Sequence, residues 1–420
     1  MKLKVKLFSC VSCVFIALCI CACKQLGNTA KSYHFDENGV SREVLENYLE
    51  RAITQVYFLM PNVPGRREGR NPYYEDDVRM IKNIGAKFIG RAIYRWGGES
   101  LLNSPEFQDQ AKRIIGEMHE FDPDIVFQAC LFEIITTDVN GVPIPDWVFA
   151  EFGLPVEERN FSYEAMLNEN GRMVDHWREN SSVPDITRTE TQMWFYFLAG
   201  YYINLGCEAF HIGQVELIGM NDPDKSAWAG VIARMRQYAK AHAPHHWVII
   251  DAHVPYGGMV KDGVSLLDFN SFPLRVKEVL DKPYEGMLEV DYLDGIYNKS
   301  RGCTTPSGWS CEHLPYLVEF DNFGRSSKGG NVSTVETHFI WGWDEISWLS
   351  LQPEAYRNDW IRYAWDWIKK TDPNGHLQMP GGRMITCPNE TDGNYRANTK
   401  SEACPVGYSQ EETIKQLWGN

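Results

Sequence analysis

The chain has 420 residues, of which 44% are hydrophobic and 23% charged, so it carries ample apolar surface for a large core. Its formal net charge of −15 argues against a nucleic-acid partner, because no basic stripe is available to neutralise phosphates. Aromatic residues make up 13% of the chain, with 14 Trp, and their flat rings are platforms on which sugar rings can stack.

The first 23 residues have the pattern of an export signal. Three lysines precede an apolar run of about 15 residues, which fits a signal-peptide core and is too short for a confident membrane span. The run ends Ile20-Cys21-Ala22-Cys23, which resembles the lipobox of bacterial lipoproteins. That resemblance implies cleavage before Cys23, acylation of its sulfur and a membrane-tethered protein in the bacterial cell envelope. An uncleaved anchor or a plain secretion signal is the alternative.

Strand and helix patterns then alternate through most of the chain, which predicts one α/β domain, a (β/α)₈ TIM barrel. We expect a signal peptide at 1–22, a tether at 23–45, the barrel at 46–377 and a C-terminal extension at 378–420. Residues 136–189 interrupt the rhythm after the third strand, and we interpret them as an insertion that builds a substrate wall. The expected strands lie at 53–60, 87–96, 124–135, 207–217, 247–254, 264–270, 314–322 and 337–345.

Six cysteines follow the signal segment. Cys130 and Cys207 lie in apolar strand context and are expected to be buried thiols. The other four lie in loop-like sequence. Because an exported chain permits disulfides, we expect two bridges, one of which links two residues of the C-terminal extension. The expected bridges are Cys303–Cys311 and Cys387–Cys404.

Four of the expected strands end in two polar residues spaced i, i+2. Residues at this spacing point to the same face of a strand, so each strand delivers two polar groups to one side at its carboxyl end. Because the carboxyl ends of barrel strands meet at one rim, these groups predict an active site there. The pairs are Gln214/Glu216, Asp251/His253, Asp268/Asn270 and Glu319/Asp321.

On these placements, roughly residues 50–370 resemble clan A glycoside hydrolases. Those barrels carry a Glu acid/base at the end of strand four, a Glu nucleophile at the end of strand seven and often a Trp at the end of strand eight. The resemblance implies that Glu216 is the acid/base, that Glu319 is the nucleophile and that Trp341 and Trp343 form the floor of a sugar subsite. It also implies a retaining hydrolase for an extracellular or periplasmic poly- or oligosaccharide, with no cofactor.

Further polar residues are expected to bind sugar hydroxyls and tune pKa values. Glu133, which ends the third strand, and Asp321 are the reserve carboxylates if one of the two glutamates is misassigned. Arg91 and Arg95 share a face of the second strand, and they could pair with the carboxylates, bind an acidic sugar or simply form a structural pair. The full set of expected substrate-binding residues is Arg95, Glu133, His211, Gln214, Asp251, His253, Asp268, Asn270, Asp321, Trp341 and Trp343.

Two other functions remain open from the sequence. Asp251 and His253, with His211 or Asp268, have side chains that bind metals, so a metal-dependent hydrolase is one alternative. No Cys/His cluster with zinc spacing accompanies them, and we expect no metal. The other alternative is a catalytically silent barrel that binds glycan at a membrane surface.

Overall fold

The computed structural model describes residues 31–62, 71–290, 292, 299–326, 329–332, 339–388 and 393–419. The chain divides into the units Met1–Lys31 and Ser32–Asn420, and the second unit holds every helix and strand described below. The expected signal peptide and Cys23 lie outside the described residues. Within those described ranges, no helix is both long and apolar enough to cross a bilayer.

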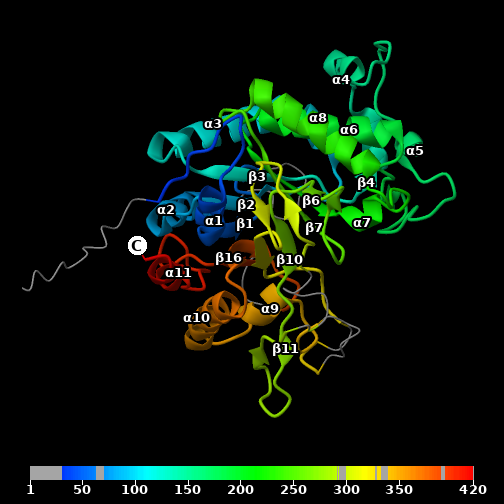
Figure 1. The fold of residues 1–420 in the computed structure, drawn as a ribbon. Helices are drawn as coiled ribbons and strands as arrows, with labels where there is room; N and C mark the ends of the chain where they lie inside the picture. Colours follow the sequence, from blue (N-terminus) through cyan, green and yellow to red (C-terminus); the bar gives the residue numbers. More distant parts are fainter. Residues whose placement is uncertain are drawn as a thin grey trace, which may run out of the picture. The chain divides into compact units, whose positions relative to one another are not determined.

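Eight parallel strands close into a barrel, which confirms the expected fold (Figure 1). β1 pairs in parallel with β2 on one side and with β16 on the other, and this second pairing closes the ring. β17 (Asn394–Arg396) adds an antiparallel strand to β16. The barrel strands are β1 (Ala52–Gln55), β2 (Phe88–Ile93), β3 (Val126–Cys130), β6 (Ala209–Gln214), β7 (Ile249–His253), β10 (Asn270–Pro273), β15 (Tyr316–Glu319) and β16 (Gly375–Met384).

Helices pack around the strands (Figure 1). In α3, Ser104 caps the first turn by accepting a hydrogen bond from Phe107 N, and the apolar residues recur every three or four positions, so one stripe is buried. α2 ends at Gly85, whose φ of 67° is the left-handed cap that glycine favours. The long helices are α2 (Tyr74–Ile84), α3 (Pro105–Phe121), α6 (Thr189–Ile203), α8 (Ser226–His242) and α10 (Glu354–Thr371).

Shorter elements fill the connections. Residues 136–189 hold only short pieces, among them α4, α5 and β5. The short elements are α1 (Arg42–Glu50), η1 (Glu99–Asn103), β4 (Ile135–Thr136), η2 (Thr137–Gly141), α4 (Asp146–Glu151), α5 (Tyr163–Met166), β5 (Ser181–Ser182), α7 (Val215–Ile218), β8 (Val260–Lys261), β9 (Val264–Ser265), β11 (Lys277–Glu278), β12 (Gly286–Met287), β13 (Cys303–Thr304), β14 (Ser310–Cys311), α9 (Glu345–Ser350) and α11 (Glu411–Leu417).

The amino-terminal end of the barrel is apolar and closed. The residues that open the strands, such as Ala52, Phe88 and Val126, join one buried cluster with Leu45 and Tyr48 of α1. Burial of such side chains contributes about 1.5–3 kcal/mol each relative to exposure. This end is therefore the stabilising end of the barrel, and the polar strand ends lie at the opposite rim.

Two expected strands are wrong. Residues 340–344, in the expected eighth strand, form a tight turn that leads into α9, and β16 takes the eighth place instead. β16 contains Pro380, Gly381 and Gly382, which read as strand breakers, yet a Cβ on Gly381 would lie 2.5 Å from Gln55 Oε1. Glycine is needed there because β1 approaches so closely. β16 also runs across residue 377, where the barrel was expected to end. The second wrong strand is the sixth: it was expected at 264–270, but β10 begins only at Asn270.

Neither expected disulfide is present among the described cysteines, all six of which are thiols. Cys303 and Cys311 do face each other across β13 and β14, but their sulfurs are 3.9 Å apart, against about 2.05 Å in a disulfide. Cys387 contacts Ser350 of α9, with Sγ 3.2 Å from Oγ, and Cys404 lies in a turn after β17. The Cys387–Cys404 pairing is wrong because the two residues pack against different elements. Cys130 and Cys207 are buried thiols, as expected.

Candidate active site

A buried polar layer crosses the barrel, with one side chain from each of the eight strands. A buried polar layer is stable only when its members satisfy one another, and here two carboxylates serve as hubs. We call this set the polar floor. Its members are Thr54, Arg91, Gln128, His211, Asp251, Ser271, Glu319 and Arg383.

Glu319 is the first hub. Arg91 donates to both of its oxygens, Arg383 Nη1 donates to Oε2 over 3.3 Å and Thr54 Oγ1 donates to the same oxygen over 3.5 Å. His253 Nε2 stands 3.6 Å from Oε1. Glu319 is only 2% exposed, so this carboxylate is a counter-charge held inside the protein.

Asp251 is the second hub. It accepts from Gln128 Nε2 over 2.6 Å and from the Ser271 hydroxyl, and it contacts His211 Nδ1 at 2.7 Å. Burial raises the pKa of Asp251 to about 7, against the opposing effect of the Ser271 hydrogen bond. The two hubs are linked through Gln128, whose Oε1 accepts from Arg91 N over 3.0 Å.

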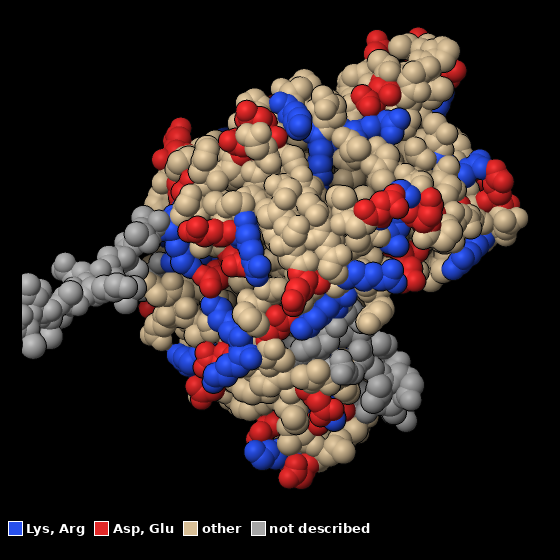
Figure 2. Space-filling view, viewed as in Figure 1, with Lys and Arg blue, Asp and Glu red and all other residues tan. Residues whose placement is uncertain are grey.

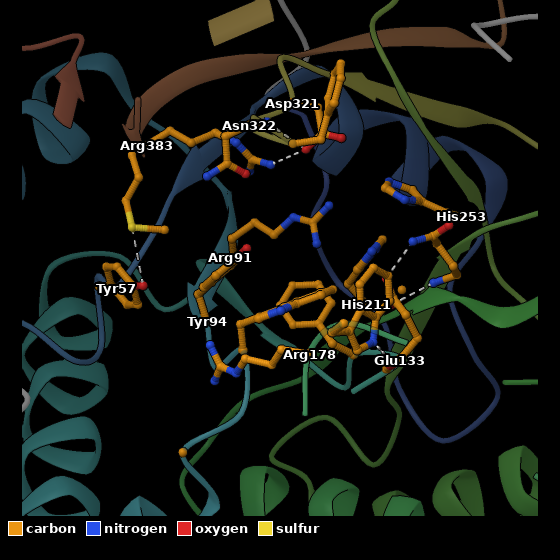
Figure 3. A pocket seen from close by; sticks show the side chains of 18 residues that line it. Tyr57, Arg91, Tyr94, Glu133, Arg178, His211, His253, Asp321, Asn322 and Arg383 are labelled. Atoms are coloured by element: carbon orange, nitrogen blue, oxygen red, sulfur yellow. Dashed lines mark hydrogen bonds and ion pairs between the residues drawn. The ribbon is translucent and has the colours of Figure 1, made fainter. Parts of the chain in front are cut away.

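A cavity of about 710 Å³ opens above the floor, at the carboxyl ends of the strands (Figure 3). This is where parallel barrels carry their active sites. Six aromatic rings form much of the wall, and charged side chains point in between them. The lining residues are Tyr57, Arg91, Tyr94, Trp96, Gly98, Phe132, Glu133, Trp177, Arg178, His211, Gly213, Gln214, His253, Asp321, Asn322, Phe323, Arg383 and Met384.

Glu133 is one of two carboxylates in this lining. It follows β3 and accepts two hydrogen bonds from Gln214, from the backbone N at 2.9 Å and from Nε2 at 2.8 Å. Gly213 allows this approach, because a Cβ there would lie 1.9 Å from Glu133 Oε2. Burial raises the pKa of Glu133 above its ordinary value, although the Gln214 hydrogen bonds oppose the rise.

Asp321 is the second carboxylate, and its environment acts in the opposite direction. It follows β15, and its Oδ1 accepts from Arg383 Nη2 over 2.7 Å and from Asn322 N over 2.8 Å. Burial opposes its ionisation, but the charges of Arg383 and Arg275 outweigh burial and hold the pKa of Asp321 below its ordinary value. Figure 3 shows Asp321 and Glu133 on different sides of the cavity, with Arg91 between them.

Two histidines line the cavity, and each has one ring nitrogen that is available to a ligand. Nε2 of His211 and Nε2 of His253 are both buried and have no hydrogen-bond partner among the described residues, and the centroids of the two rings are 4.8 Å apart. Burial, and then the charge of Arg91, lowers the pKa of His211 well below its ordinary value, so its ring is neutral near pH 7. Nδ1 of His211 is engaged by Asp251, so Nε2 is the ring nitrogen that is left to face the cavity.

Arg91 holds an unfavourable backbone conformation inside β2. Its φ of 61° lies in the left-handed region, which costs a non-glycine residue about 1–2 kcal/mol. That conformation breaks the alternation of the strand, so Arg91 and Arg95 do not share a face. Arg91 enters the cavity, while Arg95 is buried, with Nη1 3.5 Å from Glu99 Oε1. Arg95 is not in the cavity lining, contrary to its expected role.

The two glutamates expected to be catalytic lie in different surroundings. Glu319 belongs to the polar floor and not to the cavity wall. Glu216 lies in α7 and is exposed, lining a second cavity of about 560 Å³ that shares Gln214, His253 and Asp321 with the first. The strand pattern fails at Gly213, whose φ of 74° ends the alternation before α7 begins.

Of the expected substrate-binding residues, Glu133, His211, Gln214, His253 and Asp321 line the cavity, and Asp251 lies in the floor beneath it. The remaining ones lie elsewhere. Asp268 accepts from Ile250 N and pairs with Arg236 of α8, outside the barrel, and Asn270 is buried at the start of β10.

The tryptophans expected as a subsite floor also lie outside the cavity lining. Trp341 is fixed by its backbone N, which donates to Glu278 Oε1 over 2.8 Å, and by Nε1, which donates to Glu285 O over 2.8 Å. Trp343 packs close to Gly329. Trp341 and Trp343 were expected in the cavity because they were assigned to an eighth strand at 337–345, and β16 takes that place instead.

The sequence interpretation missed several cavity residues, and three of them carry the argument below. Arg383 lies near the end of the overlooked strand β16, and Trp177 and Arg178 come from the 136–189 region. The adjacent aromatic and basic residues in that region were the available signal. In the described part of the chain, no three His, Cys, Asp or Glu side chains gather closely enough to hold a metal ion.

Comparison with known proteins gives distant likenesses only. No protein-family description matches the sequence, and no curated protein matches it. Endo-glycoceramidase II from Rhodococcus sp. is 10% identical, with 91% of this chain and 80% of that chain covered at a TM-score of 0.39. The Nostoc punctiforme debranching enzyme is 13% identical (89% and 79% covered, TM-score 0.41). A family 5 glycoside hydrolase mannosidase from Rhizomucor miehei is 11% identical (88% and 92% covered, TM-score 0.40). Likenesses with such low TM-scores carry no argument. The fold is therefore established by the strand pairing of the barrel, and the function is argued from the side chains of this chain.

Proposed function

We propose that this chain is a glycoside hydrolase in which Glu133 is the general acid and Asp321 the ionised carboxylate. The observation that carries the proposal is this pair, because both carboxylates line one cavity and their pKa values are shifted in opposite directions. Glycosidic cleavage needs one carboxyl group that keeps its proton and one that stays charged. The rings of Trp96 and Trp177 in the same wall suit the faces of a sugar.

In this reaction Glu133 gives its proton to the leaving oxygen as the glycosidic bond breaks. Oδ1 of Asp321 accepts from Arg383 and from Asn322 N, and Oδ2 accepts no hydrogen bond from the residues that the structure describes. Oδ2 attacks the sugar carbon as the leaving oxygen departs. Glu133 then takes a proton from a water molecule, which breaks the bond to Asp321 and releases the sugar with both carboxyl groups restored. The polar floor supports the pair from below, since Arg91 and Arg383 neutralise the charges of Glu319 and Asp321. The stereochemical outcome remains the one expected from the sequence, a retaining reaction, which NMR of the first-formed anomer tests.

The competing assignment keeps Glu216 as acid/base and Glu319 as nucleophile. Four variants separate the two assignments: Glu133→Gln, Asp321→Asn, Glu216→Gln and Glu319→Gln. Glu133→Gln should lower kcat about 10²–10⁴-fold on oligosaccharides but far less on aryl glycosides with activated leaving groups, which need little protonation. Asp321→Asn should abolish turnover of both, while binding persists. Full activity in either variant contradicts the proposal, and leaving-group dependence in Glu216→Gln favours the competing pair.

The assay is release of reducing ends from a panel of polysaccharides and aryl glycosides. Glu164→Gln is the matched control, because Glu164 is an exposed glutamate of α5 outside the cavity lining. A parallel series with chelator tests the metal-dependent alternative, which predicts loss of activity. Binding of glycan without any release of reducing ends in the wild-type protein would favour the non-catalytic alternative.

The cellular location is a proposal from the sequence alone. Acylation of Cys23 would tether the barrel to the envelope membrane. Cys23→Ser should then release the protein into the soluble fraction or block its processing. Unchanged membrane partition in that variant would point to an uncleaved anchor.

A further inference from the structure

The cavity is positively charged in a protein that is acidic as a whole. Three guanidinium groups line it, those of Arg91, Arg178 and Arg383, although the chain has a net charge of −15. On the face drawn in Figure 2, basic and acidic residues are interspersed. These three arginines lie where the substrate would bind.

Two of these charges are already neutralised and one is not. Glu319 and Asp321 pair with Arg91 and Arg383, so those four groups balance. Arg178 has no carboxylate within ion-pair distance in the described part of the chain, and its side chain is exposed. Glu133 does not supply the missing charge, because both of its oxygens accept hydrogen bonds from Gln214 and it makes no ion pair with Arg178 among the described residues. One positive charge therefore remains for a ligand.

The backbone of Arg178 is held in a fixed relation to the proposed acid. Trp177 Nε1 donates to Glu133 O over 3.0 Å, and the Trp177 ring packs edge-on against Trp96 with centroids 5.0 Å apart. Ser181 N donates to Arg178 O over 3.0 Å, which fixes the turn that carries the arginine. Figure 3 shows Arg178 across the cavity from Arg383 and Asp321. A sugar stacked on the ring of Trp177 would thus meet the neighbouring Arg178 with one of its substituents.

We propose that the substrate is an acidic carbohydrate, whose carboxylate or sulfate group binds Arg178. A planar guanidinium matches both groups with two parallel hydrogen bonds, which a neutral hydroxymethyl group cannot return. The inference deepens the proposed hydrolase, since it names the substrate class of the same cavity. A carboxylate and a sulfate ester share this chemistry, and they are separated by the ligands used below.

The test measures binding, so that it does not depend on hydrolysis. Titration of the wild-type protein, followed by tryptophan fluorescence and calorimetry, uses matched sets of monosaccharides: glucose, glucuronate and glucose 6-sulfate, then galactose, galacturonate and galactose 6-sulfate. We expect at least one acidic sugar to bind more tightly than its neutral counterpart, and added salt to weaken that binding. The better of the two acids identifies the carboxylate or the sulfate as the natural group.

Arg178→Gln should weaken binding of the acidic sugar about ten- to hundredfold and leave the neutral sugar unchanged. The control is Arg172→Gln, since Arg172 is an exposed arginine of the same region that does not line the cavity. Equal affinity for acidic and neutral sugars in every set, or equal losses for both in Arg178→Gln, overturns the inference. If acidic sugars bind selectively and no substrate is ever cleaved, the hydrolase proposal fails while the anion site stands.

Discussion

Replacing Glu319 by Gln tests whether this residue is a structural counter-charge or the nucleophile. The variant leaves Arg91, which is 4% exposed and has no other carboxylate within ion-pair distance in the described ranges, facing a neutral amide. Breaking a buried ion pair costs about 3–5 kcal/mol. Arg383 keeps Asp321 at 2.7 Å, and the new amide oxygen still accepts one hydrogen bond, so we expect the lower end, about 3 kcal/mol. With an unfolding entropy of about 2.1 cal/mol/K per residue, a 420-residue chain should lose about 3 °C in Tm.

The assay is urea and thermal unfolding at pH 7, followed by circular dichroism and tryptophan fluorescence. Glu216→Gln is the matched control, because Glu216 is exposed and such a change should stay within about 0.5 kcal/mol. A Glu319→Gln protein that unfolds like wild type but has lost all turnover would refute this reasoning. Glu319 would then be the nucleophile, as the sequence had indicated.

Three further changes have defined outcomes. Gly213→Ala should lower kcat with the fold retained, since its Cβ would displace Glu133 Oε2 and its φ of 74° disfavours alanine; circular dichroism beside kinetics checks this, and unchanged kcat contradicts it. Asp251→Asn should flatten the pH dependence of stability. The raised pKa of about 7 gives a contribution that is present below about pH 4 and lost as the pH rises through 7, so parallel pH profiles of wild type and variant would disprove it. Mild oxidation should join Cys303 to Cys311 and stabilise the protein by about 2–3 kcal/mol, which peptide mapping and unfolding measure.

The barrel was predictable because most of its strands are apolar runs separated by amphipathic helices. Six of the expected strands overlap β1, β2, β3, β6, β7 and β15. β16 escaped because Pro380 and paired glycines replace the apolar alternation, and the need for them arises from Gln55, which is more than 300 residues earlier in the chain. Contacts of that kind cannot be read from a local pattern.

The site was predictable at the level of the rim, and less so at the level of single side chains. His253 and Asp321 reach the cavity as the i, i+2 rule requires. Glu216 does not reach the main cavity, because the left-handed Gly213 ends the strand alternation inside β6 and Glu216 falls in α7. Glu133 gained its importance from burial and from Gln214, which are tertiary effects that the residue's own neighbours in sequence do not reveal.

The pairing of β1 with β16 has a consequence for how the protein is made. These strands lie at residues 52–55 and 375–384, so the first strand emerges from the ribosome roughly 320 residues before its second neighbour. At about 5–20 residues per second, the nascent chain carries an open-edged, incomplete sheet for about 15–60 s. Unpaired strand edges recruit other chains. Ribosomes stalled before residue 375 should therefore yield aggregates or chaperone-bound chains, and only ribosomes that pass residue 384 can release a closed barrel.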